Sequence, residues 1–224
     1  MTREIEPLPE GRNLPRSGCY VFIALGLVLT SLTLWGFYTM FRQDQAIAKF
    51  TSDAPAPVPS AALLDQQAAD ELSARFRAFA EGRSDTFELT VEEINRAITT
   101  FGPLEEYRGL LYFKSIDAAR SMTVADVSLT LNQPRFWRGH RYLNGWIEFK
   151  PTATEAGLQL LAYDVVVPDR EVDPGFVSSF GNLDWLGGFR QDDHPTAKAF
   201  IERVRSVGFS PDKVSLRATA TDSD

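Results

Sequence analysis

The sequence predicts an α+β protein, in which an N-terminal transmembrane helix is followed by helices packed on a curved antiparallel β-sheet. Three observations predict this class. Residues 19–41 form an uncharged apolar run. Helical apolar spacing and a helix-capping motif follow between residues 60 and 102. From residue 109, segments rich in β-branched and aromatic residues alternate with turn-prone segments, as in consecutive antiparallel strands.

The apolar run at residues 19–41 is long enough to span a membrane. Its 23 residues would form a helix about 35 Å long, at ~1.5 Å per residue, against a hydrocarbon core of about 30 Å. The competing interpretation is a cleaved signal peptide, because Ala46-Ile47-Ala48 has the A-x-A pattern of a cleavage site. A secretory apolar region is usually only about 7–15 residues long. We therefore expect a single-pass signal anchor.

The basic residues around this run predict its orientation. Arg3, Arg12 and Arg16 precede the run, whereas Arg42 and Lys49 are the basic residues in the twenty positions after it. Because basic residues are enriched on the cytoplasmic side, the N-terminus is expected in the cytoplasm. The sequence thus predicts a protein of the inner (cytoplasmic) membrane with an extracytoplasmic C-terminal domain.

A proline-rich segment separates the run from the rest of the chain. Pro55, Pro57 and Pro59 occupy alternate positions, which favours an extended, semi-rigid spacer that holds the domain off the bilayer. The expected organisation is a disordered cytoplasmic tail (1–18), the transmembrane helix (19–41), the linker (42–59), the extracytoplasmic α+β domain (60–218) and a disordered tail (219–224).

Charge and cysteine content restrict the possible partners. The formal net charge of −7 resides in residues 60–224, because acidic and basic residues balance before residue 60. Such an acidic domain repels backbone phosphates, so no nucleic-acid partner is expected. The single cysteine, Cys19, lies in the apolar run, so no intramolecular disulfide can form. The expected partners are the membrane lipid bilayer and an apolar ligand or an envelope protein.

Three helices are predicted within the domain. Ser60 can cap the first, which runs to about Glu81. Thr90 and Glu93 form a capping box that begins the second, which ends at Gly102. The third begins near Pro195 and ends at Gly208. Apolar stripes identify their buried faces: Leu64, Ala68, Leu72, Phe76 and Phe79; Ile94, Ala97, Ile98 and Phe101; and Ala197, Phe200, Ile201, Val204 and Val207.

Four consecutive strands are expected at residues 109–116, 122–131, 143–150 and 158–167, with a closing strand at residues 213–218. The fourth strand is apolar on both faces. Strict alternation places Leu158, Leu160, Ala162 and Val166 opposite Leu161, Tyr163, Val165 and Val167. This strand is therefore either covered on both sides or borders a cavity.

Motifs for catalysis or metal binding are missing from the sequence. It contains no G-x-S-x-G, H-E-x-x-H or phosphate-loop motif. Its two histidines are His140 and His194. His194 follows two aspartates, a set that could hold a metal, but an acidic helix N-terminus with Pro195 in its first turn is the favoured interpretation. We expect no enzyme, no catalytic residues, no metal and no cofactor.

An arginine-rich, aromatic segment at residues 134–142 contrasts with the acidic domain around it. Such a segment could bind an anionic head group, a glycan or a partner protein through cation–π and bidentate contacts. Alternatively, it is a hairpin connection whose rings pack on the sheet and whose arginines pair with surplus acids. The candidate ligand- or partner-contact residues are Arg135, Phe136, Trp137, Arg138, Arg141 and Tyr142.

Three segments together resemble a known group of proteins: FELTVEEINRAI at residues 87–98, RYLNGWIEF at 141–149 and GLQLLAYDVVVP at 157–168. They resemble the poorly characterised, single-anchor extracytoplasmic bacterial proteins of YpmS type. The resemblance implies a helix-plus-sheet domain related to tubular lipid-binding folds, without catalytic residues. The chain departs from the group in its long proline-rich spacer and its arginine–aromatic segment.

The leading functional hypothesis is a single-pass, non-enzymatic membrane protein whose domain binds a lipid-like ligand or supports cell-envelope assembly. One alternative is a protein-interaction module of a membrane complex, with residues 135–142 as the contact. The other is an envelope hydrolase that uses His140 or His194 with nearby acids.

Overall fold

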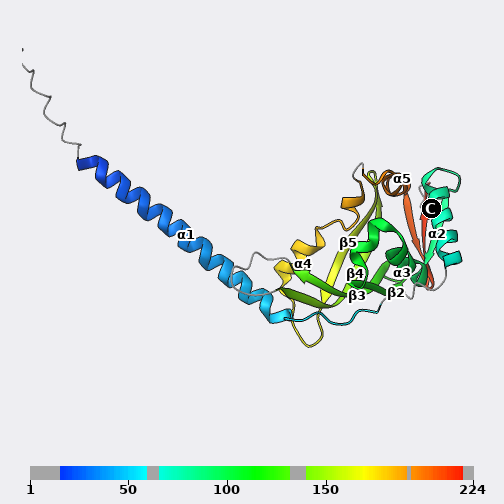
Figure 1. Ribbon diagram of the computed structural model, residues 1–224, viewed down its shortest axis with the longest axis horizontal. Helices are drawn as coiled ribbons and strands as arrows, with labels where there is room; N and C mark the ends of the chain where they lie inside the picture. Colours follow the sequence, from blue (N-terminus) through cyan, green and yellow to red (C-terminus); the bar gives the residue numbers. More distant parts are fainter. Residues whose placement is uncertain (1–15, 60–65, 132–139, 191–192, 219–224) are drawn as a thin grey trace, which may run out of the picture. The chain divides into compact units, whose positions relative to one another are not determined.

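The computed structural model describes residues 16–59, 66–131, 140–190 and 193–218 (Figure 1). The chain divides into two compact units, Met1–Gln45 and Ala46–Asp224. The described residues form five α-helices and two antiparallel sheets. The predicted α+β class is therefore confirmed.

Helix α1 (Arg16–Phe50) contains the apolar run. From Tyr20 onward its mean hydropathy reaches 1.9, and among the described residues it is the one helix long and apolar enough to cross a membrane, judged by length and composition. The hydroxyl of Thr33 donates to the Leu29 carbonyl at 2.8 Å, so the helix itself satisfies this polar group. The predicted long apolar helix is confirmed, whereas its orientation stays a prediction.

The larger sheet contains β2 (Leu111–Asp117), β3 (Met122–Leu131), β4 (Arg141–Thr154) and β5 (Gly157–Val166), paired in this order. All three pairings are antiparallel. The four consecutive strands that the sequence predicts are thus present.

A bulge in β5 corrects the predicted faces of this strand. Phe149 pairs with Ala162 and Glu148 pairs with Asp164, which leaves Tyr163 as an extra residue. Tyr163 is exposed, whereas Ala162 and Val165 are both buried in one cluster. The prediction that Ala162 and Val165 lie on opposite faces is wrong, because the bulge shifts the alternation by one residue.

The smaller sheet has the order β1-β7-β6, formed by β1 (Thr86–Thr90), β7 (Lys213–Arg217) and β6 (Ser206–Phe209). The closing strand predicted at residues 213–218 is β7. The sequence predicted neither β1 nor β6, and it extended the last helix to Gly208. That helix instead ends at Arg203, because pairing with β7 draws the following residues into a strand.

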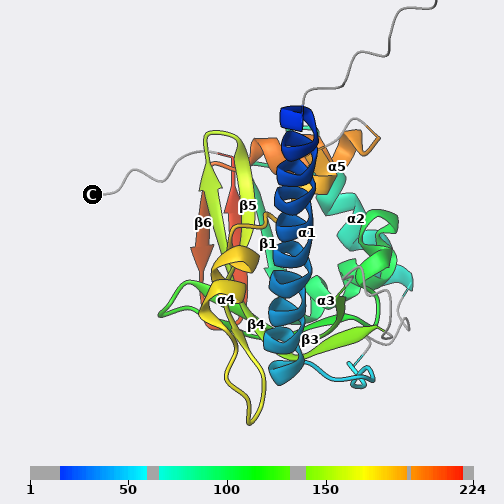
Figure 2. The same ribbon diagram turned by 90° about the vertical axis from the view of Figure 1, so that its left-hand side faces the viewer.

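Helices α2 (Gln66–Ala80), α3 (Val91–Thr100) and α5 (Pro195–Arg203) lie together, whereas α4 (Pro174–Gly181) lies apart from them against β5 (Figures 1 and 2). The predicted start of the first helix at Ser60 falls outside the described residues. Two short 3-10 helices, η1 (Gly102–Tyr107) and η2 (Gly187–Arg190), precede β2 and α5.

The predicted capping box at the start of α3 is confirmed. The Thr90 hydroxyl accepts a hydrogen bond from the Glu93 N–H at 3.2 Å, and the Glu93 carboxylate accepts one from the Thr90 N–H at 2.9 Å. Each side chain thus accepts a hydrogen bond from a backbone N–H that has no acceptor within the helix.

The first part of the proline-rich linker is attached to the larger sheet. Ser52 and Tyr142 exchange two backbone hydrogen bonds of 2.9 and 2.8 Å. The Ala56 N–H donates to Ser128 Oγ and to Asn144 Oδ1, both at 3.1 Å. Because the prolines alternate with other residues, Ala56 retains a backbone N–H that can donate these hydrogen bonds. The alternating prolines predict an extended, semi-rigid spacer, and the structure adds that Ser52 and Ala56 of this segment are hydrogen-bonded to β3 and β4.

Buried apolar side chains form two clusters. The first, which we call the closed cluster, joins the larger sheet to the last turn of α1 and includes Phe50, Ala125, Val127, Leu143 and Ile147. The second, which we call the cavity cluster, joins the smaller sheet to α2, α3 and α5. It includes Phe87, Ala97, Leu158, Phe189 and Phe200, with Phe76, Phe101 and Leu104 packed against it.

Candidate functional site

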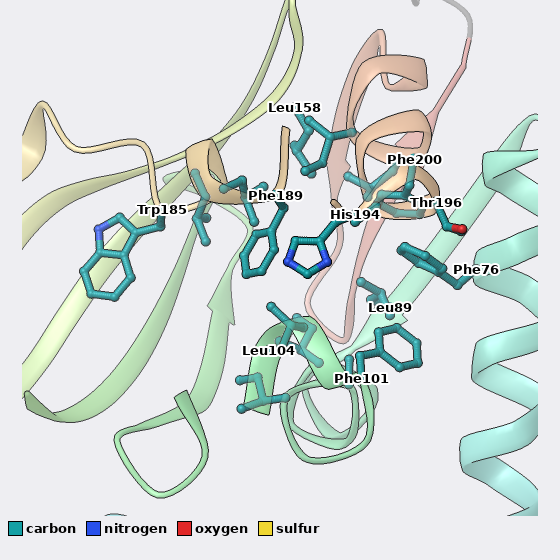
Figure 3. A pocket seen from close by; sticks show the side chains of 18 of the residues that line it. Phe76, Leu89, Phe101, Leu104, Leu158, Trp185, Phe189, His194, Thr196 and Phe200 are labelled. Carbon is teal, nitrogen blue, oxygen red and sulfur yellow. The ribbon is translucent and has the colours of Figure 1, made fainter. Parts of the chain in front are cut away.

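A cavity of about 620 Å³ with a largely apolar lining lies inside the second unit (Figure 3). Its lining comes from α2, α3 and α5, from β1 and β7 of the smaller sheet, and from β2 and β5 of the larger sheet. The cavity therefore lies where the two sheets and three helices meet.

Phenylalanine rings form one wall of the cavity. Phe76 of α2 stacks on Phe200 of α5, with ring centroids 4.4 Å apart. Phe101, just after α3, lies 5.2 Å from Phe76. Phe87 of β1 meets Phe200 edge-on at 5.1 Å. Such offset and edge-on contacts hold large apolar rings in defined positions, so this wall is well ordered and apolar.

The opposite wall comes from the larger sheet and the segment around η2. Leu158 and Leu160 of β5 line the cavity, together with Trp185 and Phe189. Trp185 packs edge-on against Phe149, with centroids 5.0 Å apart. Strand β5 thus borders a cavity, which is one of the two interpretations that its sequence left open.

His194 is the polar ring that the close view places in the middle of the pocket. Its imidazole lies between Phe189 on one side and Leu89 and Phe101 on the other (Figure 3). The rings of Phe189 and His194 are 6.0 Å apart. His194 Nε2 lies 3.8 Å from an Asp193 carboxylate oxygen, which is longer than a hydrogen bond.

Exposed polar residues mark the opening of the cavity. Arg77 of α2, Asp193 and Thr196 line the cavity and are exposed. The Arg77 side chain makes one long hydrogen bond, 3.4 Å from Nε to the Ser73 carbonyl oxygen. No carboxylate among the described residues lies within ion-pair distance of Arg77. The guanidinium is therefore available at the opening.

Two buried polar atoms in the lining have no hydrogen-bond partner within the described part of the chain. They are Thr123 Oγ1 and Trp185 Nε1. Tyr107 also lines the cavity, and burial together with nearby Glu106 raises the pKa of its phenol. Tyr107 is therefore neutral at physiological pH. The Tyr107 phenol, the Thr123 hydroxyl and the Trp185 N–H are thus uncharged polar groups in the lining.

No metal site is apparent in the part of the chain that the structure describes, since no three His, Cys, Asp or Glu side chains gather closely enough there. Asp192, one member of the possible metal set, falls outside the described residues. His140 is exposed just before β4. The expectations of no metal, no cofactor and no enzyme stay predictions.

The candidate contact residues from the sequence lie away from this cavity or cannot be placed. Arg135, Phe136, Trp137 and Arg138 fall outside the described residues. Arg141 and Tyr142 lie at the start of β4, and neither lines the cavity. The contact role of all six residues stays a prediction.

Arg141 binds the end of α1 within the second unit. Its guanidinium donates to the Ala48 carbonyl at 2.7 Å, to the Thr51 carbonyl at 2.6 Å and to the Thr51 hydroxyl at 2.8 Å. It also pairs with Asp53, and its side chain is only 13% exposed. These bonds satisfy carbonyl groups at the helix C-terminus, which complements the helix dipole.

Sequence reasoning gave a cavity beside the fourth strand as one of two interpretations, but it did not identify the helices and the smaller sheet that complete the lining. Phe76, Ala97 and Phe200 belong to the predicted apolar stripes, and the sequence identified them as buried residues of helices. The one signal for a cavity was the apolar character of β5, which a filled core explains equally well.

No protein-family model, curated protein or solved structure matches this chain. The geometry of the cavity and the composition of α1 therefore carry the functional argument.

Proposed function

We propose that the chain is a single-pass, membrane-anchored binding protein, not an enzyme, whose extracytoplasmic α+β domain holds a lipid-like ligand at the cell envelope. The observation that carries this proposal is the apolar cavity of about 620 Å³. An N-terminal helix of membrane-spanning length and composition supports the anchor.

The size and lining of the cavity suit a small apolar ligand. Small-molecule sites usually have volumes of about 300–1,000 Å³ and mostly apolar walls with a few polar groups. Here Phe76, Leu158 and Phe200 are typical of the walls, and polar residues gather at the opening. Each Å² of apolar ligand surface removed from water contributes roughly 25 cal/mol, so burial of an acyl chain in this cavity favours binding.

Other functions have weaker support. A hydrolase would need a nucleophile positioned against a base, and among the described residues His194 has only the 3.8 Å approach of Asp193. The interaction-module hypothesis depends mainly on residues 135–138, which the structure does not describe. The resemblance to YpmS-type proteins agrees with lipid binding.

Native mass spectrometry of the full chain, extracted gently from membranes, tests the proposal. The wild type should carry a lipid-like adduct. Ala197→Phe should lose it, because Ala197 lines the cavity and a larger side chain would fill the space. The matched control, Ala74→Phe, adds the same ring at an exposed position of α2 outside the lining and should keep the adduct. A wild-type chain without adduct, or equal adducts on both variants, would contradict the proposal.

A further inference from the structure

We propose that the ligand is a single-chain amphiphile with a carboxylate head, and that Arg77 binds this carboxylate at the opening of the cavity. The inference rests on the proposed function and adds the chemical class of the ligand.

The cavity has an end with charged side chains, at Arg77 and Asp193, and an uncharged end, at Trp185. Thr196 and Trp185 lie at opposite ends of the labelled residues in Figure 3, with the aromatic wall and His194 between them. Arg77 directly follows Phe76 on α2, and Phe76 stacks on Phe200 of α5 close to Thr196. A ligand with its head at the Thr196 end would therefore meet Arg77, and its chain would extend toward Trp185.

Arg77 differs from the neighbouring arginines in its contacts. Arg75 pairs with Glu93, Arg96 pairs with Glu92 at 2.9 Å, and Arg203 pairs with Asp85 at 2.8 Å. Arg77 has no such carboxylate among the described residues, although the chain has a surplus of acids. A guanidinium binds a carboxylate in a planar, bidentate arrangement. The carboxylate that Arg77 lacks can thus come from the ligand.

Asp193 is the other charged group at the opening, whereas His194 lies in the middle of the pocket. Asp193 lies on the α5 side, next to His194. Its negative charge repels an anionic head from that side. The head group is therefore directed toward α2, where Arg77 and the hydroxyl-bearing Ser73 line the cavity.

The volume of the cavity suits a single chain. A cavity of about 620 Å³ lies within the range of about 300–1,000 Å³ that is usual for small-molecule sites. Such a volume accommodates one acyl chain with its carboxylate at the opening.

Photocrosslinking in membranes that contain the full chain tests this inference. The two probes are a sixteen-carbon fatty acid with a diazirine near its methyl end and the corresponding fatty alcohol. The acid should label peptides that line the cavity, around Leu104 and Phe189. Arg77→Gln should reduce labelling by the acid at sub-saturating concentration about tenfold, the effect of losing one charge-assisted hydrogen bond. Labelling by the alcohol should not depend on Arg77.

Arg83→Gln is the matched control, because Arg83 pairs with Glu81 and does not line the cavity. It should label like the wild type. If acid and alcohol label the cavity equally and Arg77→Gln changes neither, the head-group inference is wrong but the proposed function survives. If neither probe labels the cavity, the head-group inference and the proposed function are both overturned. Equal limited-proteolysis patterns of the two variants would show that the fold is unchanged.

Discussion

The closed cluster and the cavity cluster differ in how completely side chains fill them. In the closed cluster Phe50, Leu143 and Ile147 are at most 1% exposed, and none of them lines the cavity. In the cavity cluster Phe76, Phe101 and Leu104 are only partly buried and face open space. Ile98, Leu111 and Phe113 of the closed cluster also line the cavity, so the filled region is the part of that cluster around Phe50, Leu143 and Ile147. The comparison teaches that this part supplies stability, whereas the cavity cluster leaves room for a ligand. Four predictions test this division, in order of decreasing effect.

Removal of the last turn of α1 should have the largest effect on the closed cluster. A chain that begins at Ser60 lacks Ile47 and Phe50, which are 5% and 1% exposed. Since losing one buried phenylalanine side chain alone costs about 3–5 kcal/mol, and domains are stable by only about 5–15 kcal/mol, this fragment should be largely unfolded. A fragment that begins at Ala46 should fold. Urea unfolding followed by circular dichroism measures the stability of both fragments. Equal unfolding midpoints would refute the conclusion that the closed cluster supplies the stability.

The same leucine-to-alanine substitution should lower the free energy of unfolding by different amounts in the two clusters. Leu143→Ala, in the closed cluster, should lower the free energy of unfolding by about 2–5 kcal/mol, because it creates a cavity in a filled core. Leu104→Ala should cost less than about 1.5 kcal/mol, because Leu104 is partly buried and already borders open space. Denaturant unfolding monitored by tryptophan fluorescence is the measurement. Similar costs at both positions would mean that the cavity is filled in solution.

Arg141→Ala should destabilise the closed cluster by about 1–3 kcal/mol, because the Ala48 carbonyl loses its Arg141 donor and the Thr51 carbonyl keeps only Arg170 of its two arginine donors. Arg83→Ala, which removes an exposed ion pair, should change stability by less than about 1 kcal/mol. Thermal unfolding compares the two variants. If Arg141→Ala keeps full stability but abolishes ligand or partner binding, the contact role predicted from the sequence is correct.

The smallest expected effect on stability comes from the capping box that begins α3, a helix that contributes to the cavity lining. Burial acts to raise the pKa of Glu93, but hydrogen bonds from Thr90 and Arg75 outweigh burial, so this pKa is lowered. A lowered folded-state pKa stabilises the protein above the usual glutamate value of about 4.3, and this contribution is lost as the pH falls through the folded-state pKa. Unfolding temperatures measured between about pH 3 and 6 should therefore depend less on pH in Glu93→Gln.

Local signals in the sequence predicted much of the fold. The charge-free run at residues 19–41 predicted the apolar helix, because span length and composition suffice for that inference. Thr90 and Glu93 predicted the start of α3, because a capping box involves only four neighbouring residues. Strands β2 to β5 followed from residue type and turn spacing. Each of these features depends on contacts that are close in sequence.

Features that depend on distant partners were not predicted. Strand β6 exists because Val207 pairs with Leu216 of β7, although Val207 also fits the apolar stripe of α5. The bulge at Tyr163 depends on the register against β4. Arg141 was expected at a contact surface, but the carbonyl groups that it binds are far away in sequence.

The sequence by itself determined that the chain has a long apolar helix and an α+β domain, and which side chains of α2, α3 and α5 turn inward. Only the tertiary structure decided that Phe76, Leu158 and Phe200 surround open space while Phe50 and Leu143 meet partners. Periodicity shows the direction in which a side chain points, but the distance to the facing wall depends on how sheets and helices pack. The cavity is a property of that packing.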